Sequence, residues 1–221
     1  MILFLSAIVL AIALGFVFGG NLRGIGELRL RWWGLAMGGL ALQFIPLPEG
    51  SGGTDLIVRT AVLVASYVLL LSFGALNVKL PGMPLVLLGL AANLIVIAAN
   101  GGMPVSAEAL RASGQADLIA QLEEAGADKH HLLSDGDVLT PLADVIGVPK
   151  PIGQAISIGD VVQYGGLMWL VFAAMRGRIP SSQMASEPYR GKHRRGEEPV
   201  RAPDPGPPVS LPAAMTSGTE P

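Results

Sequence analysis

The chain has 221 residues, of which 51% are hydrophobic and only 14% are charged, and its mean hydropathy is +0.53. Soluble domains carry about 25% charged residues, so this composition argues against a soluble globule, a nucleic-acid binder and a disordered chain, and indicates a membrane protein. The absence of cysteine excludes disulfides and thiolate chemistry.

Five apolar stretches predict five transmembrane helices, and the expected fold is therefore an all-α polytopic membrane bundle. Crossing ~30 Å of hydrocarbon takes about 20 helical residues, so the shorter second and fourth stretches need flanking residues to span. The stretches lack the period-2 alternation of barrel strands. The predicted helices cover residues 2–18, 32–47, 56–75, 84–99 and 158–174.

The first stretch could instead be a cleaved signal peptide. No basic residue precedes its apolar run, and Gly19, Gly20 and Asn21, which follow it, do not form an A-x-A-like cleavage site. We therefore expect an uncleaved first helix.

The placement of lysine and arginine predicts the orientation in the membrane, because cytoplasmic loops are enriched in these residues. Residues 19–31 contain three arginines and the tail 176–221 contains seven bases, whereas loop 100–157 contains eight acids and three bases. We expect a multi-pass plasma-membrane protein with its N-terminus outside and its C-terminus in the cytoplasm, in contact with the lipid bilayer.

The chain is expected to divide into a membrane domain, residues 1–175, and a tail, residues 176–221. The tail contains nine of the seventeen prolines and almost no apolar clustering. Such a segment cannot bury a core, so a disordered cytoplasmic tail is predicted.

Few polar residues interrupt the predicted spans. Asn93 and Asn100 lie seven residues apart, on one face of the fourth helix, where interhelical hydrogen bonds are expected. Arg59 and Asp160 fall at predicted outer helix ends, where snorkelling or hydration lowers the cost of their charge. The lack of a charge near the midplane argues against an ion-coupled transporter.

Small residues predict where helices can approach each other closely. Gly15 with Gly19, and Gly34 with Gly38, form small-xxx-small pairs in the first and second predicted helices. Both pairs suggest helix packing.

The segment after the fourth helix combines a helix stop with a flexible backbone. Asn100 and Gly101 permit the positive φ of a helix end, and Pro104 forces Met103 into an extended conformation. Gly101 and Gly102 would also let the backbone approach another element or a ligand. A helix terminus and a binding role are both open here.

The outer loop is expected to contain one or two short amphipathic helices after Ser106 and Glu108, because Leu110, Leu118, Ile119 and Leu122 recur at helical spacings, with breaks at Gly114 and Gly126. His130 and His131 precede several aspartates, but their spacing matches no metal motif. No metal or cofactor is therefore expected.

The fifth helix begins at a predicted capping box formed by Ser157 and Asp160. Asp160 could alternatively be a functional carboxylate at the mouth of the bundle. Residues 144–151 must run extended between the two helix ends, so three separate segments are expected to gather into one outer cap. The candidate binding residues are Asn100, Gly101, Gly102, Pro104, His131, Asp144, Ser157 and Asp160.

This order of motifs resembles a bacterial family of small polytopic membrane proteins known only as a domain of unknown function. Asn-Gly-Gly-Met-Pro-Val-Ser at 100–106 is followed by His131 and Leu132, by Leu-x-Asp-Val-Ile-x-x-Pro at 142–149, and by Ser-Ile-Gly-Asp at 157–160. The resemblance covers about residues 1–175. It implies a membrane location and a layout, but no reaction and no catalytic residue.

Three functions remain open, in this order of preference. The first is an accessory or binding protein whose acidic outer loop meets a protein or a small molecule. The second is a small permease for a neutral solute. The third is a membrane enzyme that uses outer-side carboxylates, which the lack of a nucleophile–base pair disfavours.

Overall fold

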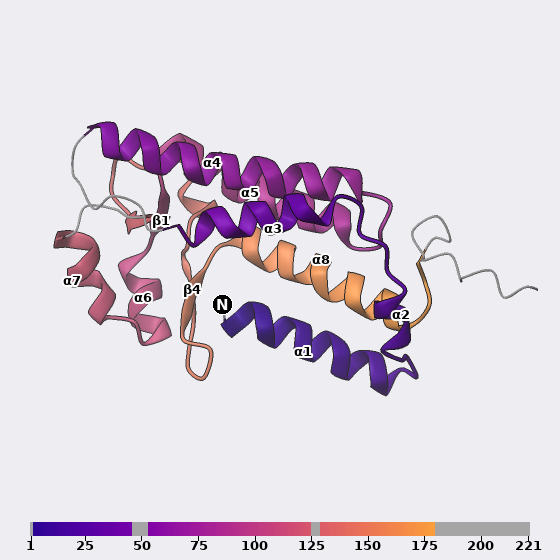
Figure 1. The fold of residues 1–221 in the computed structure, drawn as a ribbon. Helices are drawn as coiled ribbons and strands as arrows, with labels where there is room; N and C mark the ends of the chain where they lie inside the picture. Colours follow the sequence, from indigo (N-terminus) through magenta and orange to yellow (C-terminus); the bar gives the residue numbers. More distant parts are fainter. Residues whose placement is uncertain (1, 46–52, 125–128, 180–221) are drawn as a thin grey trace, which may run out of the picture. The chain divides into compact units, whose positions relative to one another are not determined.

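The computed structural model describes residues 2–45, 53–124 and 129–179. Each of the five predicted apolar stretches forms a helix (Figure 1). Apolar residues continue along the whole of each stretch and do not alternate with polar ones. A run of this length and pattern favours a helix over a half-buried strand. The five helices are α1 (Ile2–Val17), α3 (Trp33–Gln43), α4 (Gly53–Leu76), α5 (Met83–Asn100) and α8 (Ile158–Met175).

Three segments within these helices are long and apolar enough to cross a membrane: Ile57–Leu76 of α4, Met83–Asn100 of α5 and Ile158–Met175 of α8. The other two helices are shorter, with 16 residues in α1 and 11 in α3. At 1.5 Å per residue α3 is only about 16 Å long. Helix lengths thus support three of the five predicted spans.

Helix α3 is shorter than expected for two local reasons. Trp32 has φ 54° and ψ 40°, a left-handed conformation that separates it from the helix it precedes. At the other end the helix stops before Pro46, since proline disfavours helical geometry in the preceding residue. The predicted range, residues 32–47, extended past both of these helix ends.

The helices pack in a spatial order that differs from their order in the chain. Helix α8 lies between α1 and α5, α5 also packs on α4, and α4 packs on α3 (Figure 1). The last helix of the chain therefore joins the first helix to the middle of the bundle.

Glycines permit the close contact between α5 and α8. A Cβ atom on Gly166 would lie 2.6 Å from the carbonyl oxygen of Gly82, and one on Gly159 would lie 3.0 Å from that of Gly89. Of the predicted pair in α3, only Gly38 faces a neighbouring helix, since its Cβ would lie 3.7 Å from Cδ1 of Leu69 in α4, whereas a Cβ on Gly34 would meet no described atom within 4 Å.

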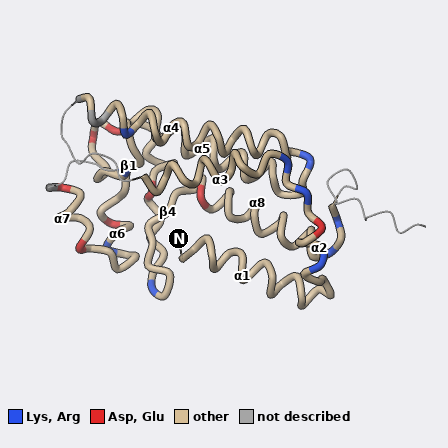
Figure 2. The backbone as a smooth tube through the Cα atoms, viewed as in Figure 1, with Lys and Arg blue, Asp and Glu red and all other residues tan. Residues whose placement is uncertain are grey.

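The connections rich in lysine and arginine lie at one end of the bundle, which we name the basic end. This end contains α2 (Arg23–Gly26), the turn between α4 and α5, and the C-terminus of α8. The buried Asn77 side chain accepts a hydrogen bond from Arg31 N (2.8 Å) and donates one to Arg31 O (2.9 Å), which ties two of these connections together. Figure 2 shows lysine and arginine gathered around α2.

The opposite end carries residues 101–124 and 129–157, which we name the cap segment. Two short helices form here as predicted, and Ser106 caps the first by accepting hydrogen bonds from Glu108 N and Ala109 N. Gly114 ends that helix with φ 76°. The elements are β1 (Met103–Val105), α6 (Ala107–Ser113), α7 (Asp117–Glu124), β2 (His130–Leu132), the 3-10 helix η1 (Thr140–Leu142), β3 (Ile146–Val148) and β4 (Gln154–Ile156).

The strands of the cap segment form two small sheets. β1 pairs in parallel with β2, and β3 pairs antiparallel with β4. Each strand has three residues, too few for an alternating pattern to be recognised in the sequence.

The predicted tail begins inside the packed chain. Residues 176–179 are described, and Ile179 is buried in a cluster with Leu80, Met83 and Leu170. Residues 180–221, where disorder was predicted, lie outside the described residues.

Candidate functional site

The three segments that were expected to gather at one end do come together. In the β1–β2 register Pro104 lies opposite His131. The backbone of Asp144 joins the same strand from the other side, because Asp144 N donates to Pro104 O and Ser106 N donates to Asp144 O, both at 3.0 Å. Asp144 is therefore held in place by main-chain bonds to β1.

The predicted capping box at the start of α8 is present. Asp160 N donates to Ser157 Oγ at 2.9 Å, and Ser157 N donates to Asp160 Oδ2 at 3.2 Å. Asn93 of α5 completes the arrangement, since its Nδ2 donates to Asp160 Oδ1 at 2.8 Å and its Oδ1 accepts from Ser157 Oγ at 2.9 Å. Both oxygens of Asp160 thus accept a hydrogen bond, and the interhelical role expected for Asn93 is confirmed.

Asp144 differs from Asp160 in lacking such partners. The residue is only 6% exposed, and its Oδ1 has no hydrogen-bond partner among the described residues. Its Oδ2 lies 3.9 Å from Nε2 of His130, beyond hydrogen-bonding distance. Burial, together with the negative charge of Asp160, raises the pKa of Asp144 to about 8. The raised pKa favours the protonated form of this carboxyl near neutral pH.

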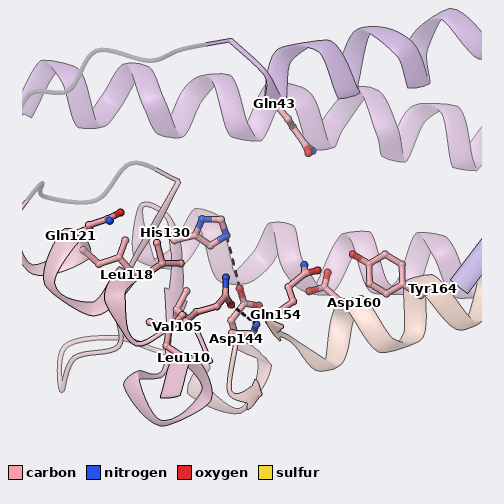
Figure 3. A pocket seen from close by; sticks show the side chains of 13 residues that line it. Gln43, Val105, Leu110, Leu118, Gln121, His130, Asp144, Gln154, Asp160 and Tyr164 are labelled. Atoms are coloured by element: carbon pink, nitrogen blue, oxygen red, sulfur yellow. Dashed lines mark hydrogen bonds and ion pairs between the residues drawn. The ribbon is translucent and has the colours of Figure 1, made fainter. Parts of the chain in front are cut away.

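A cavity of about 640 Å³ opens beside Asp144, between the cap segment and helices α3 and α8 (Figure 3). Figure 3 shows His130 and Asp144 directed toward each other, with Asp160 and Tyr164 following along α8 and Gln43 approaching from α3. The lining combines four glutamines, two carboxylates, a histidine, a tyrosine and several small or branched apolar side chains. These residues are Gln43, Val105, Leu110, Gln115, Leu118, Gln121, Leu122, His130, Asp144, Gln154, Ala155, Asp160 and Tyr164.

A smaller cavity of about 130 Å³ adjoins the first and shares Gln43, His130, Asp144 and Asp160 with it. It extends toward the helices and reaches Lys129, whose Nζ donates to the carbonyl oxygen of Gln43. Asp144 therefore faces both spaces.

The segment that follows α5 has a structural role in this arrangement. Asn100 Oδ1 accepts from Val138 N at 2.8 Å and its Nδ2 donates to Val138 O at 3.0 Å, so the side chain holds a loop of the cap segment. Gly101 ends α5 with φ 71°, as predicted. A Cβ on Gly102 would lie 3.3 Å from His131 Nδ1, which shows the expected close approach.

His131, predicted as a site residue, is directed to a different partner from His130. Its Nε2 lies 2.8 Å from Asp137 Oδ1. Burial of Asp137 opposes its ionisation, but hydrogen bonds from His131 and Ser134 outweigh this and lower the pKa of Asp137. Because successive residues of a strand face opposite sides, only one of the two adjacent histidines reaches the cavity, and it is His130.

Of the predicted site residues, only Asp144 and Asp160 line the larger cavity. The sequence pattern did not indicate the glutamines of the cap segment as a group. Arg59, expected to reach water or headgroups, is buried in the structure, at 4% exposure. Within the described residues no group of three histidine, aspartate or glutamate side chains is positioned to share a metal ion.

Comparison with known proteins gives a family match. The model of a family of unknown function, DUF5317, matches residues 27–172, from the end of α2 to the last turn of α8. No curated protein and no solved structure matches the chain.

Proposed function

The chain belongs to the DUF5317 family of unknown function, and we propose that it is an integral membrane protein that binds a small molecule in the cavity between its cap segment and helices α3 and α8. The observation that carries this proposal is Asp144. A buried carboxyl oxygen without a hydrogen-bond partner costs about 1–3 kcal/mol, and a ligand donor in the cavity would remove that cost.

The exposed surface of the helices supports a membrane location. All five long helices expose large apolar side chains, among them Val9 of α1, Met37 of α3, Ile57 of α4, Leu88 of α5 and Trp169 of α8. A soluble protein rarely exposes such side chains over contiguous areas, whereas lipid favours them. Apolar surface therefore supports embedding of α1 and α3 as well as of the three longer helices.

Flanking residues extend the two shorter helices toward a spanning length. Phe18 continues the apolar run of α1, while Trp32 precedes α3 and Phe44 and Ile45 follow it, and all four side chains are exposed. Five crossings would place the basic end in the cytoplasm and the cap segment outside the plasma membrane. The ligand would then enter from the outer side.

Binding is favoured over catalysis by the state of the two carboxyls. Asp160 is engaged by Ser157 and Asn93, and no described serine or threonine lines the cavity as a nucleophile. The structure adds no observation in favour of a permease.

A matched pair of substitutions on α7 tests the binding proposal. Leu118 lines the cavity and Ala120 is exposed on the same helix, so Leu118→Trp should fill the cavity whereas Ala120→Trp should not. The three proteins would be purified in detergent, and small molecules released by denaturation would be identified by mass spectrometry. We expect a molecule retained by the wild-type chain and by Ala120→Trp but lost from Leu118→Trp. The same molecules at equal amounts in all three proteins would contradict the proposal.

A further inference from the structure

Resting on the proposed function, we propose that the ligand of this cavity is an amphipathic organic cation, with a primary ammonium group at Asp144 and an apolar chain against the leucines of the cap segment. This assignment depends on the charge of the lining, on the hydrogen-bonding capacity of its carboxyls and on the distribution of its apolar side chains.

The charge of the cavity favours a cation. Asp144 and Asp160 are both among its lining residues, whereas no described lysine or arginine is. Lys129 lies at the smaller cavity, and its Nζ is directed to the carbonyl oxygen of Gln43. An anionic ligand would be repelled by the negative charge of Asp160, and by Asp144 as well once that carboxyl has lost its proton. Specificity of this kind comes from unfavourable charge pairs as much as from favourable ones.

The two carboxyls, Asp144 and Asp160, differ in how many hydrogen bonds their oxygens already accept. Asp160 accepts one bond at each oxygen, from Asn93 and from Ser157, so its geometry is already fixed. Asp144 Oδ1 accepts none from the described residues, although its backbone is held rigidly against β1. An ammonium group has three donors and no acceptor, and it therefore complements an ionised carboxylate with an oxygen that accepts no hydrogen bond better than a hydroxyl does.

The lining of the cavity also offers the amide oxygen of Gln43 as an acceptor for an ammonium group. Gln43 Nε2 donates to Ser66 Oγ at 3.0 Å, an orientation that leaves the amide oxygen of Gln43 as an acceptor. Gln154 lies beside Asp144 and Asp160 in the cavity (Figure 3).

Apolar side chains occupy the cap side of the cavity. Leu118 and Leu122 lie four residues apart on α7 and so share one face of that helix. Leu110 of α6 and Val105 of β1 add to the same surface. A ligand that fills both regions has a charged end and an apolar end, and its apolar end gains free energy by leaving water.

Cation binding would be linked to proton release. The pKa of Asp144 is about 8 without a ligand, so below that pH an ammonium group must displace a proton to gain an ionised partner. Affinity should then rise about tenfold per pH unit toward pH 8 and level off above it. The titratable groups that line the two cavities with Asp144 are Lys129, His130 of β2, Asp160 and Tyr164 of α8, and Tyr67 of α4. A protonated His130 would repel the cation and act in the same direction.

The test uses n-hexylamine, n-hexanol and hexanoate as probes. Each is titrated calorimetrically into the purified full chain in a neutral detergent, with detergent alone as the blank. At pH 8 we expect hexylamine to bind at least tenfold more tightly than hexanol and hexanoate not to bind. Asp144→Asn should weaken the binding of hexylamine at least tenfold and leave the affinity for hexanol unchanged. The control Asp135→Asn, at an exposed acid of the same segment, should change neither affinity.

Equal affinity for hexylamine and hexanol, or unchanged hexylamine binding to a folded Asp144→Asn chain, would overturn the assignment. If that variant does not fold, the pH profile of the wild-type chain decides, because affinity that does not rise between pH 6 and pH 8 contradicts the assignment. Failure of the ligand class is distinguishable from failure of the proposed function. If only the ligand class is wrong, Leu118→Trp still loses a molecule that the wild-type chain retains, but that molecule carries no amine. If the proposed function is wrong, Leu118→Trp loses no retained molecule.

Discussion

Asn93 of α5 donates a hydrogen bond of 2.8 Å from its Nδ2 to Oδ1 of Asp160, the carboxylate that caps α8. Its own Oδ1 accepts from Ser157 Oγ, so one buried amide satisfies two groups of the helix cap. Gly159 lies against the same amide, and a side chain there would collide with Asn93 Oδ1. The wall of the cavity formed by Asp160 is therefore fixed by two helices that are far apart in the sequence.

Replacement of Asn93 by alanine should destabilise the protein by about 1–3 kcal/mol, because it leaves the Asp160 carboxylate and the Ser157 hydroxyl with one partner fewer in a buried setting. Asp160→Asn should cost less, ~0.5–2 kcal/mol, by analogy with helix caps. Thermal unfolding in detergent measures both. Leu88→Ala, at an exposed position of the same helix, serves as the control. A melting temperature of Asn93→Ala equal to that of the control would show that the bridge does not stabilise the fold.

Local sequence patterns predicted the elements that depend on neighbouring residues. The apolar runs gave the five helices, Asn100 with Gly101 gave the end of α5, and Ser157 with Asp160 gave the capping box. Each of these depends on residues that are close together in the chain, so one sequence was sufficient.

Features that depend on long-range pairing could not be predicted. The choice of His130 over His131 follows from the β1–β2 register, in which each strand has only three residues. The close crossing of α5 and α8 uses Gly82 and Gly166, whose relation appears only when the helices are placed side by side. The end of α3 was signalled by Pro46, but the apolar composition around it favoured a longer helix.

The glycine crossing predicts opposite effects at two adjacent positions of α8. A Cβ on Gly166 would lie 2.6 Å from Gly82 O and 2.7 Å from Val86 N, whereas a Cβ on Gly165 would meet no described atom within 4 Å. Gly166→Ala should therefore separate α5 from α8 and lower the melting temperature by several degrees. Gly165→Ala should be neutral or slightly stabilising, since alanine favours helix. Equal melting temperatures for the two variants would contradict the close packing.

The raised pKa of Asp144 predicts a stability change that depends on pH. Its value of about 8 in the folded chain lies above the ordinary 3.8, so the folded chain binds this proton more tightly and loses stability as pH rises between these values. The amide introduced by Asp144→Asn carries no charge at any pH. The variant should match the wild type at low pH and exceed it by several kcal/mol at pH 9, because each unit of pKa shift corresponds to about 1.4 kcal/mol.

Melting curves of the wild-type chain and of Asp144→Asn, recorded from pH 5 to pH 9, measure this difference. A difference that is constant over the whole range would show that Asp144 does not titrate there.

The proposed orientation predicts which cysteine substitutions can be labelled from outside. The chain contains no cysteine, so single replacements report without background. Ala120 of α7 is exposed and suits this purpose, whereas the nearby Ser113 is only 1% exposed. In intact cells an impermeant maleimide should label Ala120→Cys and should label Ser182→Cys, in the tail, only after the membrane is permeabilised. The reverse pattern would invert the topology.

Carbodiimide modification of Asp144 tests the central claim most directly, namely that this carboxyl is buried, protonated and open to the cavity. Dicyclohexylcarbodiimide reacts with the protonated form of a carboxyl group, so it should modify Asp144 at pH 7 ahead of Asp137, whose pKa is lowered. Peptide mass spectrometry locates the adduct. We predict that modification of Asp144 declines as pH rises through about 8 and is blocked by the cavity-filling Leu118→Trp but not by Ala120→Trp. An unmodified Asp144 at pH 7, or equal modification in both variants, would contradict the account.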